Sequence, residues 1–237
     1  MRAAKHVAGL LGLMFTSEQA LAAMQMNLPP GVTTFSQGAY DIHTMVLWIC
    51  VVIGAVVFGA MIYSIFTHRK SKGAVSAEFH DNTAIEIIWT IVPFLILIAM
   101  AIPATKVLLA MEDTSNSDMS IKVTGYQWKW HYDYLGEDIS FFSNISTPDA
   151  ANLSTNANVE RDENYLLDVD NRLVIPADTK VRLLFTSADV IHAWWVQAFG
   201  VKKDAIPGFI NESWVDVPTP GVYRGKCAEL CGKNHGF

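Results

Sequence analysis

The sequence predicts a membrane-anchored α+β protein, in which a two-helix transmembrane hairpin precedes an all-β domain. Three observations lead to this fold class. The chain of 237 residues is 51% hydrophobic and only 17% charged, with a mean hydropathy of +0.25. Its apolar residues are concentrated in two long blocks, and short β-prone runs follow them. The composition excludes a disordered chain, a coiled coil and an ordinary soluble enzyme, and a net charge of −6 argues against a nucleic-acid partner.

The chain begins with a segment typical of a secretory signal peptide. Residues 1–22 contain Arg2 and Lys5, then a short apolar run, then small residues at Ala20 and Ala22. Basic, apolar and small-residue regions in this order are those of a cleaved leader, and the apolar run is too short to cross a bilayer. We therefore expect cleavage to leave the segment 23–44 outside the cytoplasm.

The two apolar blocks predict transmembrane helices at 45–66 and 87–111. The first block has no charged residue, His, Asn or Gln, and a helix of this length spans the roughly 30 Å hydrocarbon layer. The second contains Pro93 and Pro103, which membrane helices tolerate, and Lys106, whose ammonium can reach the interface. The alternative, two core helices of a soluble protein, is disfavoured because core helices are shorter and carry a polar stripe.

The charges beside the two blocks predict their orientation. The loop 67–86 carries Arg69, Lys70 and Lys72, whereas the segment 23–44 has no Lys or Arg. Basic loops remain in the cytoplasm, so we expect this hairpin loop there and both chain termini on the outer side. The signal peptide predicts the same orientation independently.

Residues 112–237 predict one outer domain with Greek-key β topology. Short β-prone runs bounded by turn residues are typical of a sandwich or barrel. The predicted strands are 121–126, 128–134, 172–175, 180–186, 193–198, 213–217 and 222–226. The stretch 144–164, rich in Asn, Ser, Thr and acids, predicts a loop insertion. The domain has 11 Lys and Arg against 18 Asp and Glu, a net charge of −7, which serves solubility or attracts a cationic partner.

The C-terminal segment carries the chemistry. Cys227, Cys231 and His235 follow one another at intervals of four residues and can converge on one metal if the loop folds over it. Two nearby thiols alone favour a disulfide in an oxidising compartment, but the added histidine favours a metal, copper above an iron–sulfur cluster, with zinc still open. His192 is a further candidate ligand, and a structural core histidine is the alternative.

Five motifs together resemble cytochrome c oxidase subunit II, of the bacterial type that carries a signal peptide. They are GYQWKW (125–130), SADVIHAW (187–194), KDAIPG (203–208), CAELCGKNH (227–235) and, at the start of the second apolar block, EIIWT (86–90). The likeness extends in order over nearly everything after the leader. It implies a cupredoxin-like domain with the binuclear copper A centre, and it implies a location in the bacterial inner membrane with this domain on the periplasmic side.

The resemblance also implies a ligand set. Cys227 and Cys231 would bridge two copper ions, His192 and His235 would each ligate one, and the backbone carbonyl of Glu229 would supply another ligand. Two bridging thiolates share one electron over both metals, which suits electron transfer. The Glu229 carboxylate is implied to reach a magnesium ion at the boundary with subunit I.

The implied function is that of the subunit through which electrons enter a proton-pumping respiratory oxidase. Electrons would pass from cytochrome c through copper to heme in subunit I, so the chain is enzymatic only as part of the complex. It has no C-x-x-C-H heme motif of its own. Partners would be subunit I, other oxidase subunits, cytochrome c and membrane lipid.

Individual roles follow from the same motifs. Trp128 is implied to receive electrons from cytochrome c, with Gln127, Asp133 and Asp189 as docking residues. We expect Trp128 and Trp130 on one strand, with both indoles on the same face. Glu86, at the start of the second apolar block, is implied to open a proton-uptake channel.

The sequence departs from the family pattern at its end, and two other functions compete with the implied one. The family continues His-x-x-Met, whereas the sequence ends at Phe237, so we expect a copper domain truncated before its methionine ligand and final strand. A quinol oxidase subunit II scaffold lacks the cysteine loop. A membrane-tethered copper-binding or delivery protein needs neither the paired tryptophans nor Glu86.

Overall fold

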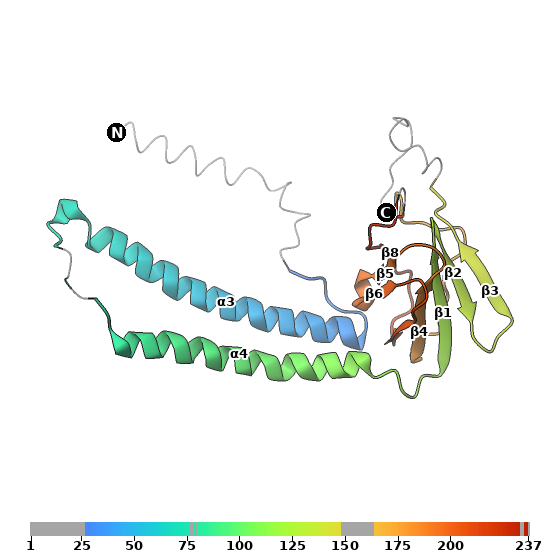
Figure 1. Cartoon of the computed structure of the whole chain (residues 1–237), viewed down its shortest axis with the longest axis horizontal. Helices are drawn as coiled ribbons and strands as arrows, with labels where there is room; N and C mark the ends of the chain where they lie inside the picture. Colours follow the sequence, from blue (N-terminus) through green and yellow to red (C-terminus); the bar gives the residue numbers. More distant parts are fainter. Residues whose placement is uncertain (1–26, 76–77, 79, 148–163, 233–234, 237) are drawn as a thin grey trace, which may run out of the picture.

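The computed structural model describes residues 27–75, 78, 80–147, 164–232 and 235–236. Two long helices lie side by side and extend away from a β domain (Figure 1). The predicted signal peptide and most of the predicted insertion 144–164 lie outside the described residues. The predicted fold class, an apolar two-helix hairpin followed by an all-β domain, is confirmed.

Each of the two helices begins after a capping side chain, and its apolar side chains are largely exposed along its length. Helix α3, Thr34–Thr67, is capped by the Thr33 side chain, and helix α4, Thr83–Glu112, by the Asn82 side chain. Their most apolar windows have mean hydropathies of 2.7 and 2.5 and bury nothing within the protein. Pro93 and Pro103 lie inside α4 without ending it. The loop between α3 and α4 contains a short 3-10 helix, η1, Lys70–Lys72.

The β domain consists of two sheets. The larger has the strand order β3-β2-β1-β4-β7 and the smaller the order β6-β5-β8. Strands β1 and β4 are parallel neighbours, and all other paired strands are antiparallel. The strands are β1 (Met119–Tyr126), β2 (Lys129–Tyr134), β3 (Ile139–Ser143), β4 (Val181–Ser187), β5 (His192–Val196), β6 (Val201–Ala205), β7 (Asn211–Val215) and β8 (Lys226–Cys227), with the 3-10 helix η3 (Gln197–Phe199) after β5.

A core of apolar side chains from both sheets holds the domain together. Ile121 and Val123 of β1 and Phe185 of β4 are fully buried. The Phe185 ring lies 5.6 Å from the ring of Trp194 on β5, which joins the two sheets. Because side chains alternate along a strand, this inward set follows from the alternation in β1 and β4.

Some strand predictions are wrong. Residues 172–175 do not form a strand, because both backbone groups of Val174 bond the Tyr134 hydroxyl: it donates to the Val174 carbonyl at 2.6 Å and accepts from the Val174 N–H at 3.0 Å. Of the predicted strand 222–226 only Lys226 pairs, within β8. Strand β3 and strand β6 were not predicted, and β6 lacks a clear apolar alternation because its sequence VKKDA has three consecutive charged residues.

The β domain packs against the ends of both helices that face it. The Thr33 hydroxyl donates to the Phe199 carbonyl at 2.7 Å, and the ring of Phe35 lies 4.2 Å from that of Trp214. The Trp214 indole N–H donates to the Ala110 carbonyl of α4 at 3.2 Å. These contacts fix the orientation of the domain relative to the helix pair.

Candidate metal centre

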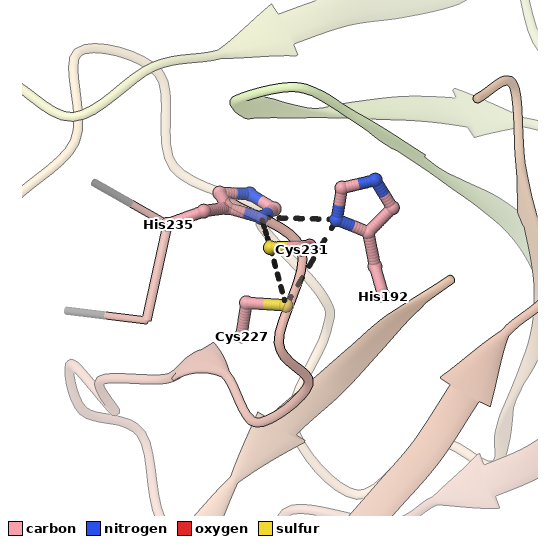
Figure 2. A group of neighbouring side chains, drawn as sticks. All are labelled: His192, Cys227, Cys231 and His235. Atoms are coloured by element: carbon pink, nitrogen blue, oxygen red, sulfur yellow. Dashed lines mark hydrogen bonds between the residues drawn. The ribbon is translucent and has the colours of Figure 1, made fainter. Parts of the chain in front are cut away.

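Four buried side chains meet at one end of the smaller sheet (Figure 2). His192 begins β5, Cys227 ends β8, and Cys231 and His235 lie on the loop that follows. One ligand atom from each lies within 4.8 Å of all the others. The structure therefore brings together the three C-terminal candidates and the distant candidate His192.

The distances favour a metal site, and both cysteines are free thiols in this structure. The sulfurs of Cys227 and Cys231 are 3.6 Å apart, whereas bonded sulfurs lie about 2.05 Å apart. The Nδ1 atoms of His192 and His235 are 3.0 Å apart, and the Cys231 sulfur lies 3.1 Å from Nδ1 of His235. Two sulfurs and two imidazole nitrogens in a buried pocket form a donor set that suits copper or zinc.

Strand pairing explains why residues distant in sequence meet. β5 and β8 are antiparallel, with Trp194 opposite Cys227. The Ala193 N–H donates to the Cys227 sulfur at 3.4 Å, which orients this side chain toward the neighbouring His192. On the other side, Gly125 of β1 leaves room for the histidine ring, because a Cβ there would lie 2.6 Å from its Cδ2 atom.

Burial controls the protonation of the metal-free site. It raises the pKa of the Cys231 thiol to about 12, and the adjacent Cys227 adds to this effect. Burial also lowers the pKa of His235 to about 4, with a further contribution from His192. Near neutral pH the site thus holds a neutral imidazole at His235, ready to ligate, and a thiol at Cys231 that must lose its proton to a metal.

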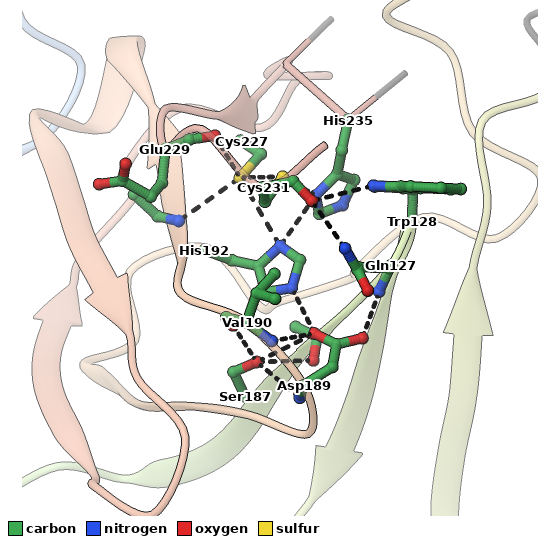
Figure 3. A network of polar contacts seen from close by, with 12 residues as sticks. Gln127, Trp128, Ser187, Asp189, Val190, His192, Cys227, Glu229, Cys231 and His235 are labelled. Carbon is green, nitrogen blue, oxygen red and sulfur yellow. Dashed lines mark hydrogen bonds and ion pairs between the residues drawn. The ribbon is translucent and has the colours of Figure 1, made fainter. Parts of the chain in front are cut away.

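A hydrogen-bond network surrounds the cluster (Figure 3). The Asp189 carboxylate accepts from Nε2 of His192 at 2.8 Å and from the Gln127 backbone N–H at 2.7 Å. Partial burial acts to raise the pKa of Asp189, but its hydrogen bonds outweigh burial and hold that pKa below its ordinary value. The Gln127 side chain and the Trp128 indole each donate to the Cys231 carbonyl at 3.1 Å.

Comparison with known proteins identifies the family. Residues 119–237 match the family model of the cytochrome c oxidase subunit II periplasmic domain, and residues 22–107 match that of the subunit II transmembrane domain. The chain belongs to the cytochrome c oxidase subunit II family. Subunit II is part of a heme–copper oxidoreductase complex, and the four-residue cluster is a ligand set of the copper A type.

Relatives match nearly the whole chain. It is 38% identical to a probable cytochrome c oxidase subunit 2 of Rickettsia bellii over 98% of this chain and 86% of the relative. It is 35% identical to cytochrome c oxidase subunit 2 of Cereibacter sphaeroides over 99% of this chain and 83% of the relative. The crystal structure of the periplasmic domain of subunit II (CoxB) of Bradyrhizobium japonicum is 40% identical, covers 52% of this chain and 81% of that chain, and has a TM-score of 0.45.

Trp128 and Trp130 of this subunit II lie differently from the prediction. Trp128 precedes β2 in a turn and is 42% exposed, so the expected shared strand is wrong. Its indole reaches the Cys231 carbonyl because the turn leads it over the cysteine loop. Trp130 does lie on β2, with its ring 5.2 Å from that of His235 and 5.8 Å from that of His192. The sequence analysis does not predict that Trp130 lies beside the ligands. The only sequence signal for it is the proximity of Trp130 to Trp128 in the segment WKW (128–130).

The remaining predicted residues lie at different distances from the cluster. The Glu229 carbonyl oxygen is 3.7 Å from the Cys227 sulfur, while its exposed carboxylate accepts from the Leu230 N–H at 2.9 Å. Asp133 lies half-buried on β2, opposite Lys122 in register. Glu86 is in the first turn of α4, at the end of the hairpin remote from the β domain (Figure 1).

Proposed function

We propose that this chain is the subunit through which electrons enter a proton-pumping respiratory cytochrome c oxidase, from cytochrome c through a binuclear copper A centre to heme in subunit I. The observation that carries the proposal is the cluster itself, in which two free thiols 3.6 Å apart are flanked by two Nδ1 atoms. When bound, a thiolate-bridged copper pair supplies a site that gains and loses one electron with little rearrangement.

Five residues of the chain would hold the copper pair. Cys227 and Cys231 would provide the bridging sulfurs, His192 and His235 one nitrogen each, and Glu229 a backbone carbonyl. The four side chains are buried, which excludes water, and the pairing of β5 with β8 anchors His192 and Cys227. The exposed Glu229 carboxylate is available to a magnesium ion at the boundary with subunit I.

The electron path proposed from the surface begins at Trp128. Its half-exposed indole contacts solvent on one side and donates to the carbonyl of the ligand Cys231 on the other, so it joins the surface to the ligand loop directly. Gln127, Asp133 and Asp189 are the proposed docking residues. A domain charge of −7 would attract a lysine-rimmed cytochrome c over long range, and added salt would weaken that attraction.

The helix pair supports the proposed membrane orientation and proton uptake. Its basic loop, with Lys70 and Lys72 in η1, would lie in the cytoplasm, and the β domain at the opposite end would lie in the periplasm of a bacterial inner membrane. Glu86 would then open a proton-uptake channel from the cytoplasmic side. Lipid, subunit I and other oxidase subunits would surround the helices.

Electron paramagnetic resonance of the purified, copper-loaded chain tests the proposal. The expected result is the hyperfine pattern of one electron shared by two copper nuclei, lost in Cys227→Ser because a bridge is removed. The pattern of a single copper nucleus, or a preference for zinc with no paramagnetic signal, would contradict the proposed centre and favour a copper-binding or delivery protein.

A further inference from the structure

The carboxylate of Asp189 lies at the surface, with its side chain 30% exposed, and is hydrogen-bonded to groups of the domain. Its Oδ1 atom accepts from Nε2 of His192 at 2.8 Å, from the Val190 N–H at 2.6 Å and from the Ser187 hydroxyl at 3.4 Å. Its Oδ2 atom accepts from the Gln127 N–H at 2.7 Å (Figure 3). An ionised carboxylate offers about four lone-pair positions, so these contacts use most of its hydrogen-bonding capacity.

The contact with His192 determines which nitrogen faces the thiols. A neutral imidazole that donates from Nε2 keeps its lone pair on Nδ1. Nδ1 lies 3.9 Å from the Cys227 sulfur and 3.0 Å from Nδ1 of His235 (Figure 2). The His192 side chain is 0% exposed, so the Asp189 carboxylate, and not solvent, accepts its Nε2–H in this structure.

The other oxygen of Asp189 connects to the second ligand-bearing loop. It accepts from the backbone of Gln127, whose side chain donates to the Cys231 carbonyl at 3.1 Å. The adjacent Trp128 indole donates to the same carbonyl. A single carboxylate therefore links the ring of one ligand to the turn that holds the backbone of another.

We propose that Asp189 is a positioning residue of the metal centre: it fixes the His192 ring with Nδ1 toward the thiols and ties that ring, through the 127–128 turn, to the Cys231 carbonyl. The inference rests on the proposed function, because it concerns the same ligand set. It gives Asp189 a role in ordering the centre in addition to the docking role that the family resemblance implies.

Two substitutions separate positioning from docking. Asp189→Glu keeps the negative charge but moves the carboxylate by one methylene, so docking survives and positioning is lost. Asp189→Asn keeps the size but removes the charge and turns an N–H2 group toward N–H donors. A docking role alone predicts slower reduction by cytochrome c in the Asn variant and unchanged copper binding in both variants, whereas a positioning role predicts weakened copper binding in both. Asp138→Asn is the matched control, since it removes an equal charge from the exposed turn between β2 and β3.

The copper-loaded full chain in detergent provides the first readouts, namely copper affinity by chelator competition and the hyperfine splitting. Both Asp189 variants are expected to lose about 10-fold to 100-fold in affinity, the usual effect of removing a partner of a ligating histidine. Both should also change the splitting, while Asp138→Asn changes neither the affinity nor the splitting. Wild-type affinity and splitting in both Asp189 variants would overturn the inference. Absence of the two-nucleus pattern in the wild type would instead refute the proposed function.

A measurement on the metal-free wild type keeps the inference testable if a variant fails to fold. In the full chain with ¹⁵N-labelled histidine, the resonances of His192, assigned by their loss in His192→Ala, should show a protonated Nε2 and an unprotonated Nδ1. The opposite tautomer would overturn the inference without reference to copper.

Discussion

Gly125→Ala is expected to weaken copper binding through a steric contact with one ligand. The new Cβ would lie 2.6 Å from Cδ2 of His192, 2.8 Å from its Cγ and 3.0 Å from its Cβ. Carbon atoms pack at about 3.5 Å or more, so the ring must move by roughly 1 Å. Rotation of the His192 side chain cannot relieve the contact, because the new Cβ also lies too close to the Cβ atom of His192, which does not move when the side chain rotates.

A shift of this size exceeds the roughly 0.2 Å tolerance of metal–ligand distances. Overpacking of a filled interior costs about 1–3 kcal/mol. The metal-free protein can relieve part of that strain by displacing the ring, whereas a bound metal holds the ring in place, so the cost falls mainly on affinity. At 1.4 kcal/mol for each factor of ten, copper affinity should fall by about 5-fold to 150-fold.

Copper titration against a competing chelator, with thermal unfolding of the metal-free chain in parallel, measures both effects. Gly136→Ala is the matched control, because it is also a glycine-to-alanine change but no atom lies within 4 Å of the new Cβ position. The φ of Gly136 is +93°, so the only cost of this substitution is backbone strain. The control should lose thermal stability and keep its copper affinity. An unchanged affinity and copper spectrum in Gly125→Ala would refute the steric reasoning.

Four further outcomes are expected. Trp128→Ala should slow reduction by cytochrome c by orders of magnitude while the copper absorption bands persist, and a normal stopped-flow rate would remove Trp128 from the path. Glu86→Ala in the assembled oxidase should slow heme reduction in subunit I; unchanged turnover would argue against a proton-uptake role. Since burial raises the pKa of Cys231 to about 12, copper uptake near neutral pH should release a proton and strengthen as pH rises; calorimetry in buffers of different ionisation enthalpy measures this, and zero release contradicts it. Phe35→Ala, at a side chain 2% exposed and packed on Trp214, should lower the free energy of unfolding by about 3–5 kcal/mol, and an unchanged melting temperature would show that the helix–domain contact is not stabilising.

Features set by nearby residues could be predicted from the sequence. The helix pair follows from composition alone, because an uncharged apolar stretch long enough to cross a bilayer by itself indicates a membrane-spanning helix. Cys227, Cys231 and His235 share one loop, so their spacing was enough to indicate convergence on a metal. His192 was only a candidate, since nothing local distinguishes a ligand from a buried structural histidine.

The sequence by itself determined the membrane anchor, the β class of the outer domain and the chemical type of the C-terminal ligands. Tertiary structure alone decided that His192 meets those ligands, that Trp128 leaves the strand to contact the cysteine loop, and that Asp189 turns inward to the His192 ring. The physical reason is that periodicity and spacing report only which side of a local element is buried. Gln127 contacts Asp189, which is 62 residues away in the sequence, and Cys231, which is 104 residues away. Strand pairing and loop packing determine such distant contacts.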